Sequence, residues 1–407
     1  MKIRLDSASS TMIAVVVLVF WVVRSADAQK FEGLALTPPM GWNSWNHFGC
    51  HVDEALIRET AQAMVLSGLR DAGYRYVVID DCWQVARDTV GEIVPDPDRF
   101  PSGMKALADY VHSLGLKFGL YSDAGRLTCQ KRPGSRGYEF QDARTYARWG
   151  VDYLKYDWCN HGDQNVVASY RTMRDALYQA KRPVVFSICE WGENKPWEWA
   201  AEVGHLWRIS GDIRPAFVDR PKWGETVAGI VEIARKIRKY AGPDHWNDLD
   251  MLQVGNAGLT LSESRTHFSM WAMLASPLMA GNDVRNMPPE IAEILMNREV
   301  IAVDQDSLGV PALRWISRGN LDVWLRPLAH DEYALCVVNW GKKAERITLK
   351  LAGSEIEDED FGVTYKIGRG LAVRDLWKHR VIGLTDEEIA VAVIGHDVAM
   401  FRLGREK

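Results

Sequence analysis

The segment Val151-Asp152-Tyr153-Leu154-Lys155-Tyr156-Asp157-Trp158-Cys159-Asn160 holds the clearest indication of how this chain folds. It begins as an apolar and aromatic run that predicts a buried strand, and it ends in three reactive side chains: Lys155, Asp157 and Cys159. A parallel barrel presents such side chains where its strands end. Because strand side chains alternate between two faces, Lys155 and Asp157 lie on the same face. The segment therefore predicts a catalytic strand with Asp157 as its nucleophile.

Strand-like runs alternate with amphipathic, helix-like runs on both sides of this segment. The predicted strands begin near Met40 and continue with Tyr74–Asp80, Leu116–Ser122, Val151–Asp157, Val184–Ile188, Leu206–Ser210, Trp246–Leu252 and Pro277–Ala280. The predicted helices include Glu54–Leu69, Lys105–Leu114, Phe140–Trp149, Val166–Gln179 and Glu290–Asn297. Eight strand-plus-helix units over about 270 residues predict a (β/α)8 barrel in residues 29–310. A doubly wound open sheet is the alternative, but no glycine-rich phosphate loop follows the first strand.

The pattern of predicted elements changes after Pro311, where short strand-like segments are separated by turns that contain Gly, Asn, Asp and Lys. These segments are Asp322–Arg326, Tyr333–Val338, Arg346–Leu351, Gly370–Asp375 and Val398–Leu403. Asp386–Ala392 is the best candidate for a helix in this region. Residues 311–407 are therefore predicted to form an antiparallel β-sandwich domain.

The first 28 residues have the layout of a secretory signal peptide. Lys2 and Arg4 precede the apolar run Met12–Val23, and Ala26-Asp27-Ala28 offers a small-x-small cleavage site. The run is too short to span a bilayer unaided. We therefore expect a secreted or periplasmic protein, with an uncleaved anchor as the alternative.

The composition is that of a globular protein, and the net charge of -5 gives no reason to expect nucleic acid or a membrane surface as a partner. The 17 tryptophans suit stacking on sugar rings or, equally, an aromatic core. The oligomeric state is left open.

The six cysteines are Cys50, Cys82, Cys129, Cys159, Cys189 and Cys336. An oxidising compartment permits disulfides, although the spacing does not determine their connectivity. CxxC and HExxH spacings are absent from the sequence, so we expect neither a metal nor another cofactor.

Polar side chains gather where the predicted strands end. Such ends occur at Asp80-Asp81, Tyr121–Asp123, Cys189–Trp191, Arg208–Asp212 and Asn247–Asp250. In a parallel barrel these ends share one mouth, which predicts a single pocket. Carboxylates, Arg and Trp together suit a sugar: they supply acceptors for hydroxyls, donors for oxygens and aromatic platforms.

Hydrolysis of a glycoside requires two carboxyl groups, one to attack or orient water and one to protonate the leaving oxygen. Asp157 and Asp212 are plausible partners because their predicted strands are two apart around the barrel. If the reaction retains configuration, we expect their carboxyl groups to lie ~5–5.5 Å apart.

Six segments in this order resemble the α-galactosidases of glycoside hydrolase family 27. They are PMGWNSW at 39–45, IDDCW at 79–83, LKYDWC at 154–159, CEW at 189–191, WRISGDI at 207–213 and WNDLDM at 246–251. The resemblance covers roughly residues 35–310, includes a C-terminal β domain, and is closest to plant and bacterial members.

The resemblance implies a retaining double displacement, with Asp157 as the nucleophile and Asp212 as the general acid/base. It also implies that Asp80 and Asp81 bind the 4- and 6-hydroxyls of galactose. Lys155 would donate to the 3- and 4-hydroxyls.

Further roles are implied only by the resemblance. Arg208 would bind the 2-hydroxyl, Trp45 would form an aromatic wall, and Tyr121, Glu190, Trp191 and Asp250 would be further pocket residues. Cys50 would pair with Cys82, and Cys129 with Cys159, which places the sulfur of Cys129 beside the sugar. Cys189 and Cys336 would stay free.

Several alternatives stay open. Asp157, Asp212 and Lys155 could each be ordinary capping, turn or surface residues. Asp80 could be structural, Tyr121 could be a core residue, and Asp250 could orient Arg208 instead of touching the sugar.

The substrate also has alternatives: an α-N-acetylgalactosaminide or a β-L-arabinopyranoside of the same family, or a barrel that binds carbohydrate without catalysis. The bulk of Trp191 and the presence of both Asp80 and Asp81 favour galactose.

Overall fold

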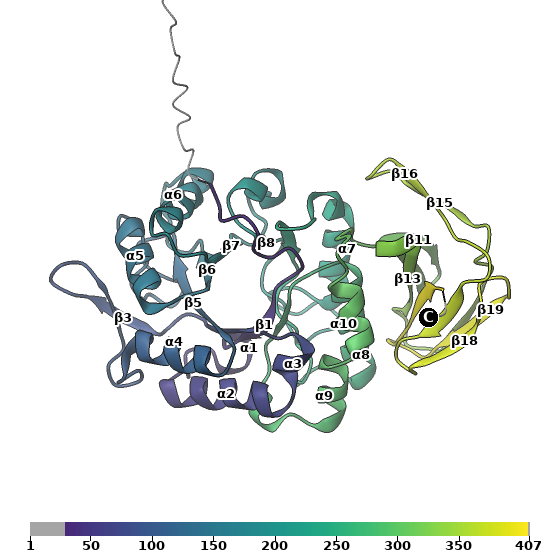
Figure 1. Ribbon diagram of the computed structural model, residues 1–407, viewed down its shortest axis with the longest axis horizontal. Helices are drawn as coiled ribbons and strands as arrows, with labels where there is room; N and C mark the ends of the chain where they lie inside the picture. The colour runs from purple at the N-terminus through teal and green to yellow at the C-terminus, as the bar shows by residue number, and fades with distance from the viewer. Residues whose placement is uncertain (1–28, 406–407) are drawn as a thin grey trace, which may run out of the picture.

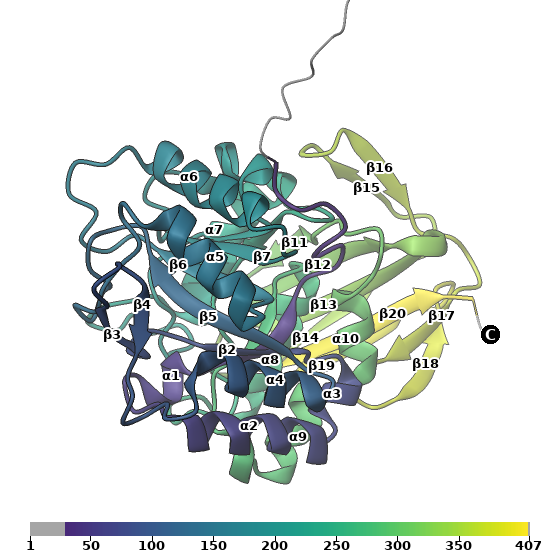
Figure 2. The ribbon, with the colours of Figure 1, turned by 60° about the vertical axis from the view of Figure 1, so that its left-hand side comes forward.

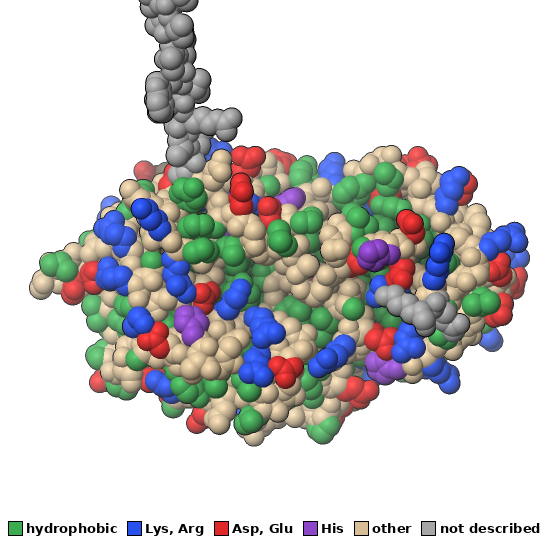
Figure 3. Space-filling view, viewed as in Figure 1, with side chains coloured by type: hydrophobic (Ala, Val, Ile, Leu, Met, Phe, Trp, Pro, Cys, Tyr) green, Lys and Arg blue, Asp and Glu red, His purple; other side chains and the backbone are tan. Residues whose placement is uncertain are grey.

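A computed structural model describes residues 29–405 and shows a barrel packed against a smaller β domain (Figure 1). The predicted signal peptide, residues 1–28, lies outside the described residues. Within the described residues, no helix is both long and apolar enough to cross a membrane. On the face in Figure 3, basic and acidic side chains are interspersed.

Eight parallel strands form the predicted barrel, in the order β10-β1-β2-β5-β6-β7-β8-β9. Their bounds are β1 Met40–Asn43, β2 Tyr76–Ile79, β5 Lys117–Asp123, β6 Tyr153–Asp157, β7 Val185–Cys189, β8 Leu206–Arg208, β9 Trp246–Asp248 and β10 Leu278–Ala280. The residues after β9 close the ring: the Leu252 amide donates to the Met279 carbonyl (2.7 Å) and the Gly281 amide donates to the Leu252 carbonyl (3.1 Å). The prediction of a (β/α)8 barrel is confirmed.

Helices surround the strands (Figures 1 and 2). They are α1 Trp45–Phe48, α2 Glu54–Leu66, α3 Leu69–Ala72, α4 Gly103–Ser113, α5 Glu139–Trp149, α6 Val166–Gln179, α7 Val227–Ile237, α8 Leu261–Met273, α9 Pro289–Leu295 and α10 Arg298–Asp304. The expected alternation fails between β7 and β8, where two short 3-10 turns, Pro196–Glu198 and Ala200–Glu202, replace a helix. Only 16 residues separate these strands, and Gly192 and Pro196 interrupt any helical run.

The C-terminal domain is a β-sandwich, as predicted. Six antiparallel strands form one sheet in the order β11-β12-β13-β20-β17-β18, and β14 pairs with β19 to cover one of its faces. The strands are β11 Leu313–Arg318, β12 Leu321–Leu328, β13 Glu332–Asn339, β14 Glu345–Leu349, β15 Glu355–Asp358, β16 Val363–Lys366, β17 Ala372–Asp375, β18 Arg380–Leu384, β19 Ile389–Val393 and β20 Val398–Gly404. Two further hairpins complete the fold, β15–β16 here and β3–β4 (Gln84–Arg87 and Ile93–Pro95) in the barrel.

The prediction that Asp386–Ala392 is the best candidate for a helix in this domain is wrong. This segment contains a turn followed by β19, and Ile389, Val391 and Val393 are buried while the residues between them are exposed. Burial with a period of two is the pattern of a strand with one covered face.

The central strands of the six-stranded sheet, β12, β13 and β20, are buried on both faces. Side chains such as Val323 and Leu335 join the core under β14 and β19, whereas their neighbours Trp324 and Cys336 join the core of the barrel. Helix α8 contacts β12, β13 and β20 from the barrel side. The two domains therefore share one apolar core across their contact.

A buried ion pair reinforces this contact. Arg238, which follows α7, is paired with Asp358 of β15 (Nη2 to Oδ2, 2.6 Å). Its Nε donates to the Ala312 carbonyl (2.9 Å) and its Nη2 donates to the Pro311 carbonyl (3.1 Å), so the same guanidinium also holds the interdomain linker.

Replacing Arg238 with alanine should lower the free energy of unfolding by about 3–5 kcal/mol, because Asp358 would stay buried without its counter-charge. Equilibrium unfolding in urea measures this change. The matched control is Arg235→Ala on α7, whose partner Glu232 is well exposed, with an expected loss of about 0–1 kcal/mol. Equal losses for the two variants would contradict the assignment.

Candidate active site

A cavity of about 540 Å³ opens at the carboxyl ends of the barrel strands. Nine of the twelve site residues predicted from the sequence line it: Trp45, Asp80, Asp81, Tyr121, Cys129, Lys155, Asp157, Trp191 and Asp212. Gln130, Glu193, Gly211, Trp223 and Gly224 complete the lining. The strand-end segments that were far apart in sequence thus meet at one mouth.

Asp157 is the last residue of β6 and is only 5% exposed. Its Oδ1 accepts a hydrogen bond from the Trp158 amide (3.0 Å) and its Oδ2 accepts one from the Tyr121 hydroxyl (2.9 Å). Both oxygens are therefore fixed in orientation. Burial raises the pKa of Asp157 to about 7, although the nearby Lys155 ammonium acts in the opposite direction.

Asp212 lies in the turn after β8, and its side chain is 35% exposed. Arg208 donates from Nη2 to Asp212 Oδ1 at 3.2 Å. Burial by itself raises the pKa of Asp212, but the Arg208 guanidinium, together with the Lys155 and Arg214 cations, holds the pKa below its ordinary value. Asp212 is therefore the more readily ionised of the two carboxyl groups.

Asp80 and Lys155 form a buried ion pair at the floor of the cavity. Lys155 Nζ lies 2.8 Å from Asp80 Oδ2, and the same oxygen accepts from Asn43 Nδ2 at 2.8 Å. Burial alone would lower the pKa of Lys155, but Asp80 and the other carboxylates raise it well above its usual range. Lys155 therefore carries a fixed positive charge beside Asp157.

Asp81 connects the second strand to the loop that carries Cys129. Its Oδ1 accepts from the Cys82 amide (2.7 Å) and its Oδ2 accepts from the Gln130 amide (2.9 Å). Burial raises the pKa of Asp81 despite these donors.

Both expected disulfides are present. Cys50 is joined to Cys82, and Cys129 is joined to Cys159, with Cα atoms 5.2 Å and 5.1 Å apart. Cys189 and Cys336 are free and buried, as expected. The second disulfide fastens a wall of the cavity, through Cys129, to the residues that follow β6.

Three predicted site residues do not line the cavity: Glu190, Arg208 and Asp250. Arg208 and Asp250 lie behind Asp212, where Arg208 Nη2 is 2.8 Å from Asp250 Oδ2. This geometry matches the alternative in which Asp250 orients Arg208. Glu190 is fully buried, and its Oε2 accepts from the amide (2.6 Å) and the side-chain Nδ2 (2.8 Å) of Asn194, so it shapes the loop after β7.

Asp123 received no role from the sequence, although it lies next to Asp157. It is buried at the end of β5, accepts from the Gly125 amide (2.6 Å) and the Cys159 amide (3.0 Å), and lies 3.5 Å from the Tyr121 hydroxyl. Its spacing of two from Tyr121 placed it on the same strand face, and that signal could have found it. The rim residues Gln130, Glu193 and Trp223 lie in loops, which have no such periodicity.

Ligand atoms of Asp123, Cys129, Asp157 and Cys159 lie within 4.8 Å of one another. The two sulfurs are bonded to each other, so this cluster offers no thiolate to a metal.

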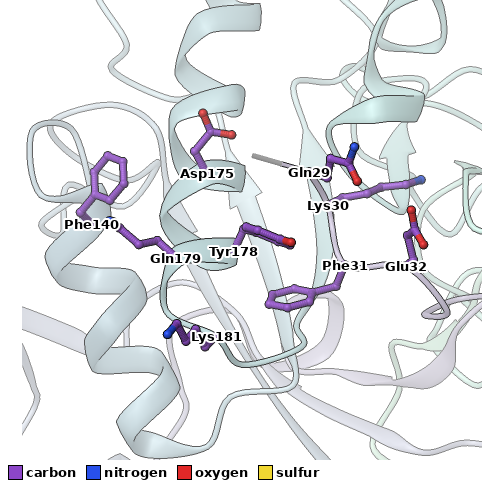
Figure 4. A pocket seen from close by; sticks show the side chains of 9 residues that line it. All are labelled: Gln29, Lys30, Phe31, Glu32, Phe140, Asp175, Tyr178, Gln179 and Lys181. Carbon is purple, nitrogen blue, oxygen red and sulfur yellow. The ribbon is translucent and has the colours of Figure 1, made fainter. Parts of the chain in front are cut away.

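A second cavity, of about 760 Å³, lies between the N-terminal segment and the outer surfaces of α5 and α6 (Figure 4). Its lining includes Phe31, Asp175 and Tyr178 but none of the residues at the strand ends. Since barrels carry their reactive groups at the carboxyl ends of their strands, the candidate active site is the cavity around Asp157.

Two family models match the chain. The model described as "Alpha galactosidase A" matches residues 37–306, and the "Alpha galactosidase C-terminal beta sandwich domain" matches residues 318–403. The boundary between these matches coincides with the change from barrel to sandwich.

Relatives and solved structures agree with the models. "Alpha-galactosidase A" of Cellvibrio japonicus is 51% identical over 383 residues, covering 93% of this chain and 94% of that protein. The crystal structure of α-galactosidase I from Mortierella vinacea has a TM-score of 0.85 at 39% identity, covering 92% of this chain and 98% of that one. The Saccharomyces cerevisiae α-galactosidase solved with raffinose also has a TM-score of 0.85, at 31% identity and with coverages of 92% and 99%. The chain therefore belongs to the α-galactosidases of glycoside hydrolase family 27.

Proposed function

We propose that this glycoside hydrolase removes terminal, non-reducing α-D-galactosyl residues from oligosaccharides, galactomannans or simple galactosides, with retention of configuration. The observation that carries the proposal is that Asp157 and Asp212 line one cavity, which also contains Asp80, Asp81 and Lys155. Two carboxyl groups supply the nucleophile and the acid, and the other groups can bind sugar hydroxyls.

In the first step the Asp157 carboxylate attacks the anomeric carbon while the Asp212 carboxylic acid protonates the departing oxygen. The bond to the leaving group breaks, a galactosyl ester forms on Asp157, and Asp212 becomes a carboxylate. Arg208 stabilises that carboxylate, since its guanidinium already donates to Asp212 Oδ1 at 3.2 Å.

In the second step the Asp212 carboxylate takes a proton from water, and the resulting oxygen nucleophile attacks the anomeric carbon. The ester bond breaks, Asp157 leaves as a carboxylate and Asp212 is again an acid. Two inversions at one carbon give net retention. The low pKa that Arg208 gives Asp212 favours the base form needed at the start of this step.

The proton must change place when the sugar binds. Of the two carboxyl groups Asp157 has the higher pKa, because burial raises it, whereas the Arg208 and Lys155 cations lower the pKa of Asp212. The first step requires the proton on Asp212 and a negative charge on Asp157. The two carboxyl groups act as a pair that holds one proton, and binding of the sugar places that proton on Asp212.

We further infer that the chain is exported. Two disulfides in the described residues suit an oxidising compartment, and the sequence of residues 1–28 has the features of a signal peptide.

Asp157→Ala should lower kcat for 4-nitrophenyl α-galactoside roughly 10⁴-fold or more, because the covalent intermediate can no longer form. Added azide should restore turnover from the vacated face and yield the inverted β-galactosyl azide. Product configuration by proton NMR measures this outcome. An α-configured azide from this variant would contradict the role of nucleophile.

Asp212→Ala should lower kcat/KM about 10²–10⁴-fold for a poor leaving group such as methanol, and less for 4-nitrophenol. Azide should here give the α-galactosyl azide, because Asp157 still forms the intermediate. The matched control is Asp163→Ala in the loop after β6, whose side chain is 97% exposed and should be dispensable. A similar loss for both leaving groups would argue against Asp212 as the acid.

The activity should fall as pH rises through about 7. The pair must hold one proton, and burial raises the pKa of Asp157 to about 7, so the proton is present below this pH and lost above it. An ordinary pair of Asp residues would have lost both protons by about pH 5. The dependence of kcat/KM on pH with methyl α-galactoside measures this limb, and a decline complete by pH 5 would contradict it.

A further inference from the structure

Trp223 is a large side chain on the rim of the active-site cavity and is 59% exposed. The floor of the same cavity, including Asp80, Asp81 and Lys155, is buried. Asp212 lies between these two zones. The cavity thus has a buried, charged floor that suits the galactosyl unit and an exposed rim formed by Gln130, Glu193 and Trp223.

The segment that carries Trp223 is bonded to the backbone around Asp212. The Glu225 amide donates to the Asp212 carbonyl (2.9 Å), and the Arg214 amide donates to the Glu225 carbonyl (2.9 Å). Gly224 makes this close approach possible, because a Cβ there would lie 2.5 Å from the Asp212 carbonyl oxygen. Trp223 therefore has a fixed position relative to Asp212.

Arg214 orders the ring of Trp223. Its Cζ lies 3.9 Å from the ring centroid, which is the geometry of a stacked cation–π contact. The guanidinium covers one face of the indole, and the high exposure of the side chain leaves the other face open to solvent.

The proposed reaction indicates which part of the substrate lies beside the open face of the Trp223 ring. Asp212 gives its proton to the oxygen of the leaving group, so the leaving group must lie on the Asp212 side of the cavity. A pyranose ring has a face of C–H groups that packs well on an indole. A leaving-group sugar is therefore the ligand whose chemistry and position suit Trp223.

We propose that Trp223, ordered by Arg214 and held beside Asp212 by Gly224 and Glu225, is the platform on which the leaving-group sugar stacks. The enzyme thereby favours galactosides whose leaving group is itself a pyranose. This inference rests on the proposed function, because it uses Asp212 as the acid.

The test compares two substrates in Trp223→Ala: melibiose, whose leaving group is glucose, and α-galactosyl fluoride, whose leaving group has no ring. The kcat/KM for melibiose should fall about 3- to 10-fold, the loss expected for one stacking contact. The kcat/KM for the fluoride should change by less than about twofold. Trp223→Phe should recover part of the melibiose rate, since it keeps an aromatic face.

Tyr178→Ala is the matched control, because Tyr178 is also an exposed aromatic residue but lines the second cavity on α6 (Figure 4). It should leave both rates unchanged. Equal losses of Trp223→Ala on both substrates, or no loss on either, would overturn the inference while leaving the proposed function standing. Wild-type enzyme that hydrolyses neither substrate would overturn the proposed function itself, and this inference with it.

Discussion

The active site depends on balancing buried negative charge. Asp80, Asp81, Asp123, Asp157 and Asp250 are all buried at one end of the barrel, where an unpaired charge costs several kcal/mol. Two buried cations compensate: Lys155 pairs with Asp80, and Arg208 pairs with Asp250 and Asp212. Backbone amides from the strand-end turns satisfy most of the remaining oxygens. Asp157 and Asp212, the carboxyl groups that we propose to be catalytic, fit this arrangement, since each lies next to one of the two cations.

The same arrangement gives the two carboxyl groups different properties. Asp157 is buried at the end of β6 and is desolvated. Asp212 lies nearer the mouth of the cavity, where its side chain contacts both Arg208 and solvent. Burial raises the pKa of the first, whereas for the second the effect of burial is exceeded by the combined effect of Arg208, Lys155 and Arg214, which lowers the pKa. Two chemically identical side chains thus obtain different pKa values from their surroundings alone, as the two proposed roles require. The disulfide from Cys129 to Cys159 ties the wall of the cavity beside Asp157 to the end of β6.

The sequence was sufficient for the barrel and most of the cavity, because a buried strand that ends in polar residues has a distinct pattern. The two disulfide pairings followed only from the resemblance to the family, since the cysteine spacing leaves the connectivity open. The sequence was insufficient for elements that lack a regular alternation of buried and exposed residues. Helix α8 is buried nearly all round between the barrel and the second domain, so it lacks the amphipathic period that reveals a surface helix. Strands β16 and β18 are mostly exposed and show no alternation, and β19 was mistaken for a helix. The position of Arg208 behind Asp212 depends on Asp250, a contact between two strand ends that only the folded chain brings together.

The six-stranded sheet with two covered faces has a consequence for how such chains can evolve. The side of α8 that would face solvent in an isolated barrel packs against β13 and β20. The barrel and the sandwich therefore cannot be exchanged as independent modules. A recombination event that separated them would expose Trp324, Cys336 and Met400 to water at once and would leave both halves prone to aggregation. The two domains are therefore expected to be inherited as a single unit.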